Sequence, residues 1–343
     1  MFNSEIKPNG CTSAGILPMQ CCAKPFDVNK IYQGNSLEVL KTFPDNSIDC
    51  CITSPPYYGL RNYGMEGQIG LEPKIDDFIF NLVSIFDEVY RVLKPTGTCF
   101  VNLGDTYSSI SGGMGKSDKN RPTGGQPKFG KRANATMDFE QNKDTGLKEK
   151  SLCLVPERFA IAMLNQGWIL RNQIIWHKPN QMPQSATDRF TVDFEKIFFF
   201  VKKPNGYHFE QQLEPYTKPL DRWGGDNLEA NGNSTWDEGT GQTSYRKRNM
   251  RPNPEGKNMR TVWSINTVPT MDAHFATYPQ RLVERMIKAG CPENGLVLDP
   301  FFGSGTTGIY ARKVNRNYVG IELNPEYVKI AENRLFKELG MFH

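Results

Sequence analysis

Short runs of apolar residues, each bounded by turn-forming residues, are spread along this chain. Most of these runs are apolar at nearly every position, which is typical of β-strands that are covered on both faces of a sheet. We therefore predict strands at residues 48–53, 98–103, 169–176, 197–202, 296–298 and 317–321.

Amphipathic stretches separate these predicted strands. Apolar side chains recur with the spacing of one helix face at residues 76–93, 156–167, 280–289 and 327–339. Strands that alternate with helices predict an α/β fold with a doubly wound, mostly parallel sheet. A chain of 343 residues is long enough for one large α/β domain with an elaboration, or for two domains.

Three polar segments lie outside this alternation. Residues 1–28 are polar and aperiodic, and we predict a poorly ordered N-terminal arm there. Residues 108–150 are rich in Gly, Lys, Asn and Ser, and they predict a flexible basic insertion. Residues 204–260 are also polar but contain several aromatic side chains. Segments of this length without regular structure are uncommon in compact domains unless they are functional or disordered.

The overall composition narrows the class of protein. The formal net charge is +4, which is compatible with a polyanionic partner without requiring one. No run of about 18 apolar residues is present, so we predict no membrane span. The first residues lack the pattern of a secretory signal, and we therefore predict a cytoplasmic protein.

The eight cysteines and four histidines show no spacing typical of metal ligands. No Cys-x-x-Cys pair occurs, so we predict no metal site. We interpret the cysteines as reduced thiols in a reducing compartment. Cys50, Cys51 and Cys99 fall within predicted strands and are expected to be small core residues.

A glycine-rich turn, residues 299–306, follows the predicted strand at 296–298. Its glycines allow the backbone to approach a ligand closely, and a helix is expected to start directly after it. About twenty residues later Glu322 ends the next predicted strand, where a carboxylate can accept hydrogen bonds from ribose hydroxyls. The turn lacks the third glycine of a dinucleotide motif and the Gly-Lys-Ser/Thr ending of a triphosphate site. A turn that only packs a helix on the sheet is the structural alternative.

A second motif, Ser54-Pro55-Pro56-Tyr57, follows the predicted strand at 48–53. Proline cannot continue a central strand, so the strand must end there. The serine hydroxyl and the Pro55 carbonyl can accept both protons of an amino group and direct its lone pair at an electrophilic methyl group. Tyr57 offers a flat face on which an extruded base can stack. A proline-rich turn with an aromatic anchor is the structural alternative.

Together these motifs resemble those of the DNA methyltransferases that modify exocyclic amino groups with S-adenosylmethionine. The resemblance covers most of residues 31–336. The catalytic motif precedes the donor motif, an order similar to that of the family's β group. By resemblance the catalytic residues are Ser54, Pro55, Pro56 and Tyr57. The implied cofactor-binding residues are Asp299, Pro300, Phe301, Gly303, Ser304, Gly305, Thr306, Glu322 and Asn35. Many members carry Asp at the position of Asn35, and a neutral side chain is expected to weaken a polar contact with the donor.

The resemblance also implies an architecture and partners. It implies a seven-stranded sheet, base flipping, duplex DNA as substrate and a bacterial or phage origin. It divides the chain into a catalytic half (29–203), a target-recognition region (204–266) and an S-adenosylmethionine-binding half (267–343). A cognate restriction endonuclease and a homodimer are compatible with it. Residues 102–105 are expected to end a strand near the catalytic pocket.

The first residue of the catalytic motif indicates the target base. Within the family, Ser usually accompanies cytosine-N4 methylation, whereas Asp or Asn usually accompanies adenine-N6 methylation. We therefore predict cytosine N4, with adenine N6 as the alternative. Methylation at C5 is not expected, because it needs a Pro-Cys catalytic turn that this motif lacks.

Basic side chains in the polar region are the predicted DNA contacts, because Arg and Lys neutralise phosphates and read guanine in the major groove. They are Arg246, Lys247, Arg248, Arg251 and Arg260. A solvated, charged insertion is the alternative. For residues 108–150, a lid that orders on DNA and a solvated loop both stay open. We interpret His177 as structural rather than as a general base. An RNA or protein methyltransferase, and a degenerate DNA-binding protein, are the other functional alternatives.

Overall fold

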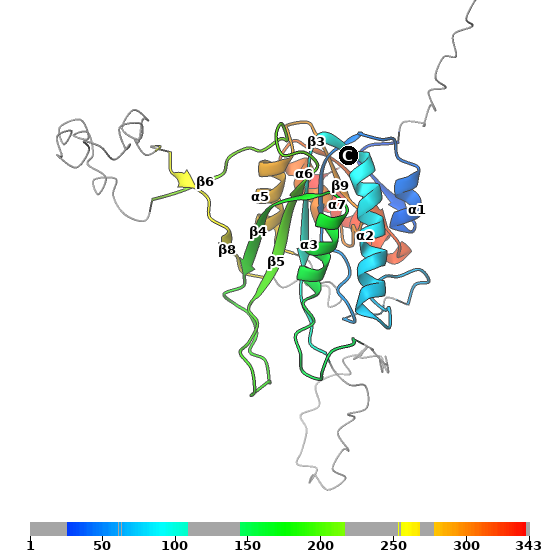
Figure 1. Ribbon diagram of the computed structural model, residues 1–343. Helices are drawn as coiled ribbons and strands as arrows, with labels where there is room; N and C mark the ends of the chain where they lie inside the picture. The colour runs from blue at the N-terminus through cyan, green and yellow to red at the C-terminus, as the bar shows by residue number, and fades with distance from the viewer. Residues whose placement is uncertain are drawn as a thin grey trace, which may run out of the picture.

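A mixed β-sheet forms the centre of the computed structural model, which describes residues 26–60, 62, 64–108, 145–216, 253, 255–267 and 278–340. Its strand order is β1-β10-β9-β2-β3-β5-β4-β8 (Figure 1). All neighbours are parallel except β5, which runs antiparallel to both β3 and β4. The strands are β1 (Lys30–Gln33), β2 (Ile48–Thr53), β3 (Leu93–Leu103), β4 (Ile169–His177), β5 (Phe194–Val201), β8 (Val262–Ser264), β9 (Leu296–Asp299) and β10 (Asn317–Glu322).

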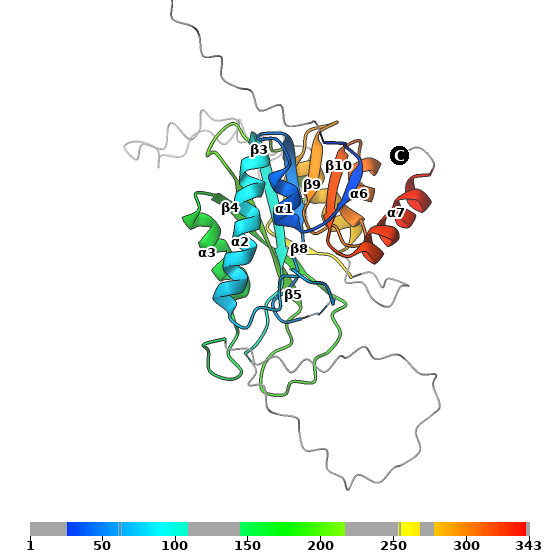
Figure 2. The same cartoon turned by 90° about the vertical axis from the view of Figure 1, so that its right-hand side faces the viewer.

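Helices cover both faces of this sheet, as Figure 2 shows from the side. One face is covered by α1 (Ser36–Lys41), α2 (Ile75–Val92) and α3 (Val155–Asn165), and the other by α5 (Gln280–Gly290), α6 (Thr306–Lys313) and α7 (Pro325–Leu339). Two apolar clusters, one on each face, form the core. The predicted doubly wound, mostly parallel α/β fold is therefore confirmed.

The predicted elements are found close to their expected positions. β2 has the predicted bounds, whereas β3 begins earlier, at Leu93. β1, α1 and a small separate sheet of β6 (Leu213–Glu214) and β7 (Lys257–Asn258) were not predicted. These elements are too short to show a periodic pattern.

The number of strands corrects one expectation, because in the described part of the chain the sheet has eight strands, one more than the resemblance implied. The additional edge strand is β8, which pairs in parallel with β4. Its central residue Trp263 is buried, and its indole N–H donates to the Arg260 carbonyl oxygen at 2.8 Å. The indole N–H of Trp176 in β4 donates to the Ile265 carbonyl oxygen at 2.8 Å. This three-residue strand thus joins the sheet by backbone pairing with β4, and the Trp176 indole adds a hydrogen bond to the residue after it.

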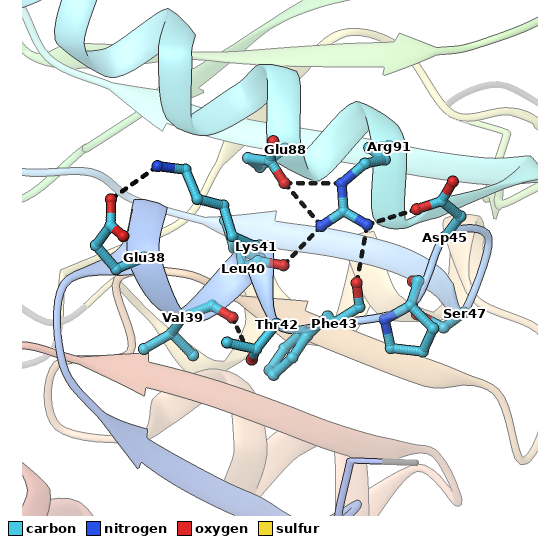
Figure 3. Close-up of polar contacts among 11 residues, drawn as sticks. Glu38, Val39, Leu40, Lys41, Thr42, Phe43, Asp45, Ser47, Glu88 and Arg91 are labelled. Carbon is cyan, nitrogen blue, oxygen red and sulfur yellow. Dashed lines mark hydrogen bonds and ion pairs between the residues drawn. The ribbon is translucent and has the colours of Figure 1, made fainter. Parts of the chain in front are cut away.

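Arg91 of α2 fixes the C-terminal end of α1 (Figure 3). Its guanidinium donates to the carbonyl oxygens of Leu40 and Phe43, each at 2.8 Å, and forms ion pairs with Asp45 and Glu88. The last carbonyls of a helix have no donor within the helix itself. A residue of α2 therefore satisfies the end of α1 and holds the two helices together.

The cysteines predicted to lie in the core, Cys50, Cys51 and Cys99, are indeed fully buried. Burial raises the pKa of the Cys50 and Cys51 thiols well above their ordinary value. Within the described part of the chain, no helix has the length and apolar character that crossing a membrane requires. The described residues also contain no group of three metal-ligating side chains. Of the predicted arm, residues 1–25 lie outside the described residues, as do residues 109–144 of the basic insertion.

Candidate active site

A cavity of about 450 Å³ lies at the carboxyl ends of the central strands. This is where doubly wound sheets bind their ligands, because loops from neighbouring parallel strands meet there. The two motifs, far apart in the sequence, line the same cavity. All predicted catalytic residues line it: Ser54, Pro55, Pro56 and Tyr57. Most predicted cofactor-binding residues do so too: Asn35, Pro300, Phe301, Gly303, Ser304, Thr306 and Glu322.

Asp299 does not line the cavity but holds its two halves together from behind. Its carboxylate accepts hydrogen bonds from the hydroxyls of Thr53 (2.6 Å) and Thr307 (2.5 Å) and from the Phe301 N–H (3.0 Å). Thr53 ends β2, so this contact joins the catalytic strand to the donor strand β9. Asp299 is 2% exposed, and burial raises its pKa. The structure places it as a support for the cavity wall.

The glycine turn after β9 needs its glycines for different reasons. Gly303 lines the cavity with a φ of +53°, which favours glycine. Gly305 lies outside the cavity lining, at the start of α6, with a φ of +82°. A Cβ atom on Gly305 would lie 3.1 Å from the Cβ of Ala331 in α7. This glycine therefore allows α6 and α7 to approach each other beside the cavity.

Glu322 presents its carboxylate at the end of β10. One oxygen accepts a hydrogen bond from the Gly303 N–H and the other from the Asn324 N–H, both at 2.8 Å. Burial raises its pKa above the ordinary value of 4.5. Each carboxylate oxygen has a second acceptor position. The backbone thus orients this carboxylate so that it can accept hydroxyl groups of a ligand.

Asn35 has a structural role at the cavity rim. It is the N-cap of α1, and its side-chain oxygen accepts hydrogen bonds from the N–H groups of Leu37 (2.9 Å) and Glu38 (3.4 Å). Asn and Asp cap helices about equally well. α1 therefore needs no Asp at this position, and the expected weaker contact with the donor stays a prediction.

The catalytic wall contains a buried hydrogen-bond network. The Tyr57 hydroxyl donates to Glu195 Oε2 at 2.6 Å and accepts from Asn102 Nδ2 at 2.9 Å. Asn102 Nδ2 also lies 2.7 Å from the same Glu195 oxygen and 3.4 Å from Ser54 Oγ. Burial, together with the Glu195 charge, raises the Tyr57 pKa well above its ordinary value. Tyr57 is therefore a hydrogen-bond donor at neutral pH and not a base.

An ion pair completes this network. Lys178, just after β4, pairs with Glu195 at the start of β5, and the two side chains are only 13% and 15% exposed. The Lys178 ammonium also lies 4.4 Å from the centre of the Trp176 ring. A buried carboxylate needs such a partner, because an unpaired buried charge is strongly unfavourable.

The Tyr57 ring rests against the backbone of Gly104. A Cβ atom on Gly104 would lie 2.6 Å from the ring carbon Cε2, which is closer than van der Waals contact allows. Gly104 follows β3, whose residue Asn102 binds the Tyr57 hydroxyl. The end of β3 therefore positions both the ring and the hydroxyl of this tyrosine.

Sequence reasoning missed Glu195 and did not single out Lys178 as a site residue. The sequence offered only a weak sign of their role. Two consecutive charged residues, Glu195 and Lys196, lie near the start of a strand that is otherwise apolar. His177 does not line the cavity, and its Nδ1 lies 3.0 Å from Ser264 Oγ, which supports its interpretation as a structural residue.

Of the five predicted DNA contacts, only Arg260 lies in the part of the chain that the structure describes. Arg246, Lys247, Arg248 and Arg251 lie outside the described residues. Arg260 is described: its side chain is 69% exposed and pairs with Glu214 at 2.7 Å. Its contact with DNA stays a prediction.

Known proteins are similar to this chain over most of its length. A family model described as DNA methylase matches residues 48–333. The type II methyltransferase M.Cfr9I of Citrobacter freundii is 38% identical over 315 residues, covering 91% of this chain and 90% of that protein. M.SmaI of Serratia marcescens is 39% identical over 310 residues, covering 90% and 91%.

Solved structures share the fold. The cytosine-N4-specific PvuII DNA methyltransferase has a TM-score of 0.56 at 20% identity, covering 91% of this chain and 88% of that one. A putative DNA modification methylase of Thermus thermophilus, complexed with S-adenosylmethionine, has a TM-score of 0.54 at 23% identity, covering 92% and 96%. The family match and the two relatives in sequence agree with the geometry of the cavity. The chain therefore belongs to the N6/N4 family of DNA methylases, and it is a DNA methyltransferase that uses S-adenosylmethionine.

Proposed function

We propose that this protein methylates N4 of a cytosine that is flipped out of duplex DNA; adenine N6 is the alternative. The observation that carries the proposal is the meeting of Ser54–Tyr57 and the glycine turn after β9 in one cavity. The preference for cytosine rests on Ser54 as the first residue of the catalytic motif. The match to a DNA methylase family argues against an RNA or protein substrate.

S-adenosylmethionine fits the donor side of the cavity. The Glu322 carboxylate, oriented by two backbone N–H groups, would accept the ribose hydroxyls. Phe301 and Ile321 line the same side of the cavity and would supply apolar surface for the adenine ring, and the turn at Gly303 would let the backbone come close to the cofactor. The bound cofactor supplies an electrophilic methyl group. Asp299 acts indirectly, by holding the turn and β2 in register.

The catalytic wall would hold the amino group of the target base. Ser54 Oγ would accept one amine proton and the Pro55 carbonyl oxygen the second, because both residues line the cavity. The Asn102 amide lies beside Ser54, with its Nδ2 3.4 Å from Ser54 Oγ. Its orientation is set because Nδ2 must face the Glu195 carboxylate. Two acceptors would direct the amine lone pair toward the methyl group.

Tyr57 would stack on the flipped base while its hydroxyl stays tied to Glu195. A protonated, anchored tyrosine cannot swing away, so the ring offers a fixed platform. The amine loses its extra proton readily after methylation. No side chain on this wall therefore has to act as a strong base.

The proposed partner protein follows from the relatives, and the proposed roles of the chain segments follow from their order along the sequence. Because M.Cfr9I and M.SmaI are named type II methyltransferases, we infer that a cognate restriction endonuclease accompanies this protein. Residues 204–266 would read the DNA sequence, and residues 29–203 and 267–343 would form the two chemical halves. A homodimer and a bacterial or phage origin stay predictions.

Nucleoside mass spectrometry tests the reaction and the base. Duplex plasmid DNA treated with the protein and isotope-labelled S-adenosylmethionine is expected to yield labelled N4-methylcytosine. The Ser54→Ala, Tyr57→Ala double variant should yield none, because it lacks both the amine acceptor and the platform. Labelled N6-methyladenine instead would support the proposed mechanism but show that adenine is the target base. Label found only in RNA or protein would refute the proposal.

The cofactor role of Glu322 predicts a dependence on pH. Glu322→Gln is expected to weaken S-adenosylmethionine binding about tenfold to a hundredfold, since hydrogen bonds to a charged acceptor are the stronger kind. Burial raises the Glu322 pKa, so protonation begins at a higher pH than for an ordinary glutamate. Wild-type affinity should therefore fall as the pH is lowered toward that raised pKa. Calorimetry at several pH values across this range should show no such pH dependence of S-adenosylmethionine affinity for Glu322→Gln. An equal pH dependence in the variant and the wild type would contradict the role of Glu322 in cofactor binding.

A further inference from the structure

The loop between β4 and β5 projects from the end of the sheet where the cavity lies (Figure 1). Its two ends are part of the cavity wall, because Lys178 precedes the loop and Glu195 follows it. The Lys178 N–H donates to the Asp193 carbonyl oxygen at 2.7 Å and closes the base of the loop. The loop therefore begins and ends at the cavity wall, and the residues between these ends project beyond the cavity lining.

The loop carries two large apolar side chains that nothing in the described part of the chain covers well. Phe190 is 95% exposed and Met182 is 76% exposed. Among the described residues, no large apolar side chain is more exposed than Phe190. Single exposed apolar residues are common, so exposure alone does not identify a function. The loop that carries Phe190, however, starts and ends at the cavity proposed to hold an extruded base, so this exposed side chain can contact DNA bound there.

Two contacts made by the residues directly before Phe190 tie the loop to neighbouring segments. Asp188 pairs with Lys150 at 2.8 Å, and the Arg189 guanidinium lies 3.9 Å from the centre of the Tyr107 ring. Both partners belong to the segments that flank residues 109–144. Phe190 is thus displayed on an anchored loop, next to cations that suit a phosphate backbone.

We infer that Phe190 enters the DNA base stack at the place that the target base leaves. Extruding a base removes its stacking contacts, and an apolar side chain inserted into the gap restores part of them. In that step the exposed Phe190 ring would replace its contact with water by contact with the neighbouring bases. This inference rests on the proposed methylation of a flipped base in duplex DNA.

The test compares paired and unpaired target bases. The first substrate is a duplex with the sequence around a plasmid position that the wild-type protein methylates. The second substrate has the same sequence but an abasic site opposite the target base, so that this base is unpaired. Phe190→Ala is expected to lower kcat/KM at least about tenfold on the paired duplex but less than about threefold on the other, where extrusion is easier. Phe190→Leu should retain most of the paired-duplex rate, because it keeps an apolar side chain of useful size.

The controls separate this role from folding and from the methylation itself. Phe80→Ala removes a phenylalanine that is 72% exposed on α2, outside the cavity lining, and should leave both rates unchanged. The midpoint temperature of thermal unfolding should be the same for Phe190→Ala and the wild type, because the Phe190 side chain is exposed. Wild-type activity on the paired duplex establishes the methylation independently of Phe190. An unchanged rate for Phe190→Ala, or an equal loss on both duplexes, would overturn the inference.

Discussion

Replacing Ser54 by alanine is expected to lower kcat at least about a hundredfold, because removing one preorganised hydrogen-bond partner of a transition state typically costs that much. Ser54 Oγ lies in the cavity, 3.4 Å from Asn102 Nδ2, where it can accept a proton of the amino group. The residues expected to hold the donor belong to other segments of the chain. Single-turnover methylation should therefore slow while calorimetric affinity for S-adenosylmethionine stays within about twofold.

Ser84→Ala is a matched control for this experiment. Ser84 lies on α2, outside the cavity lining, and its hydroxyl donates to the Phe80 carbonyl oxygen at 2.9 Å. The same chemical change there should leave kcat unaltered. A Ser54→Ala variant that methylates DNA at the wild-type rate would show that the amine is held by other groups, with the Pro55 carbonyl as the remaining acceptor of this motif.

Replacing Glu195 by leucine is expected to lower the free energy of unfolding by about 3–5 kcal/mol, the usual cost of leaving one charge of a buried pair without its partner. Lys178 would then stay buried at 13% exposure. Activity should fall as well, because the Tyr57 hydroxyl and the Asn102 amide both lose their acceptor. Urea unfolding and kcat measured on the same preparations give the two effects.

A double-mutant cycle with Lys178→Met separates these effects. The double variant should recover part of the lost stability, since no unpaired charge remains buried. It should not recover activity, because Tyr57 still lacks its acceptor. Removing the exposed pair of Lys41 and Glu38, whose side chains are 51% and 68% exposed, should barely change stability. Strictly additive stability losses at Lys178 and Glu195 would contradict the pairing.

The central part of the fold was predictable from local pattern. β2 is apolar throughout most of its length and has the bounds that its composition predicted, and the turn after β9 was recognised from its glycines. β8 was not predictable, because it is a three-residue strand in a polar region, and its pairing with β4 and the contact of the Trp176 indole with the Ile265 carbonyl oxygen are both tertiary interactions. Short edge strands depend on such contacts more than on their own sequence.

The network around Tyr57 was also beyond sequence reasoning. Asn102 and Glu195 are 93 positions apart and meet because β3 and β5 are neighbours in the sheet. The antiparallel direction of β5 brings its first residues, rather than its last, to the cavity end. A parallel β5 would place Glu195 at the opposite end, far from Tyr57.

The sequence by itself determined the family, the cofactor and the two motifs, because these depend on residue type and on spacing within a few positions. Only the tertiary structure decided that Asp299 supports the wall instead of lining it, and that Gly104 positions the Tyr57 ring. It likewise decided that Lys178 and Glu195 form the buried pair behind the catalytic motif. The physical reason is that strand order and strand direction determine which distant side chains share one low-dielectric space, and local sequence patterns do not encode that order.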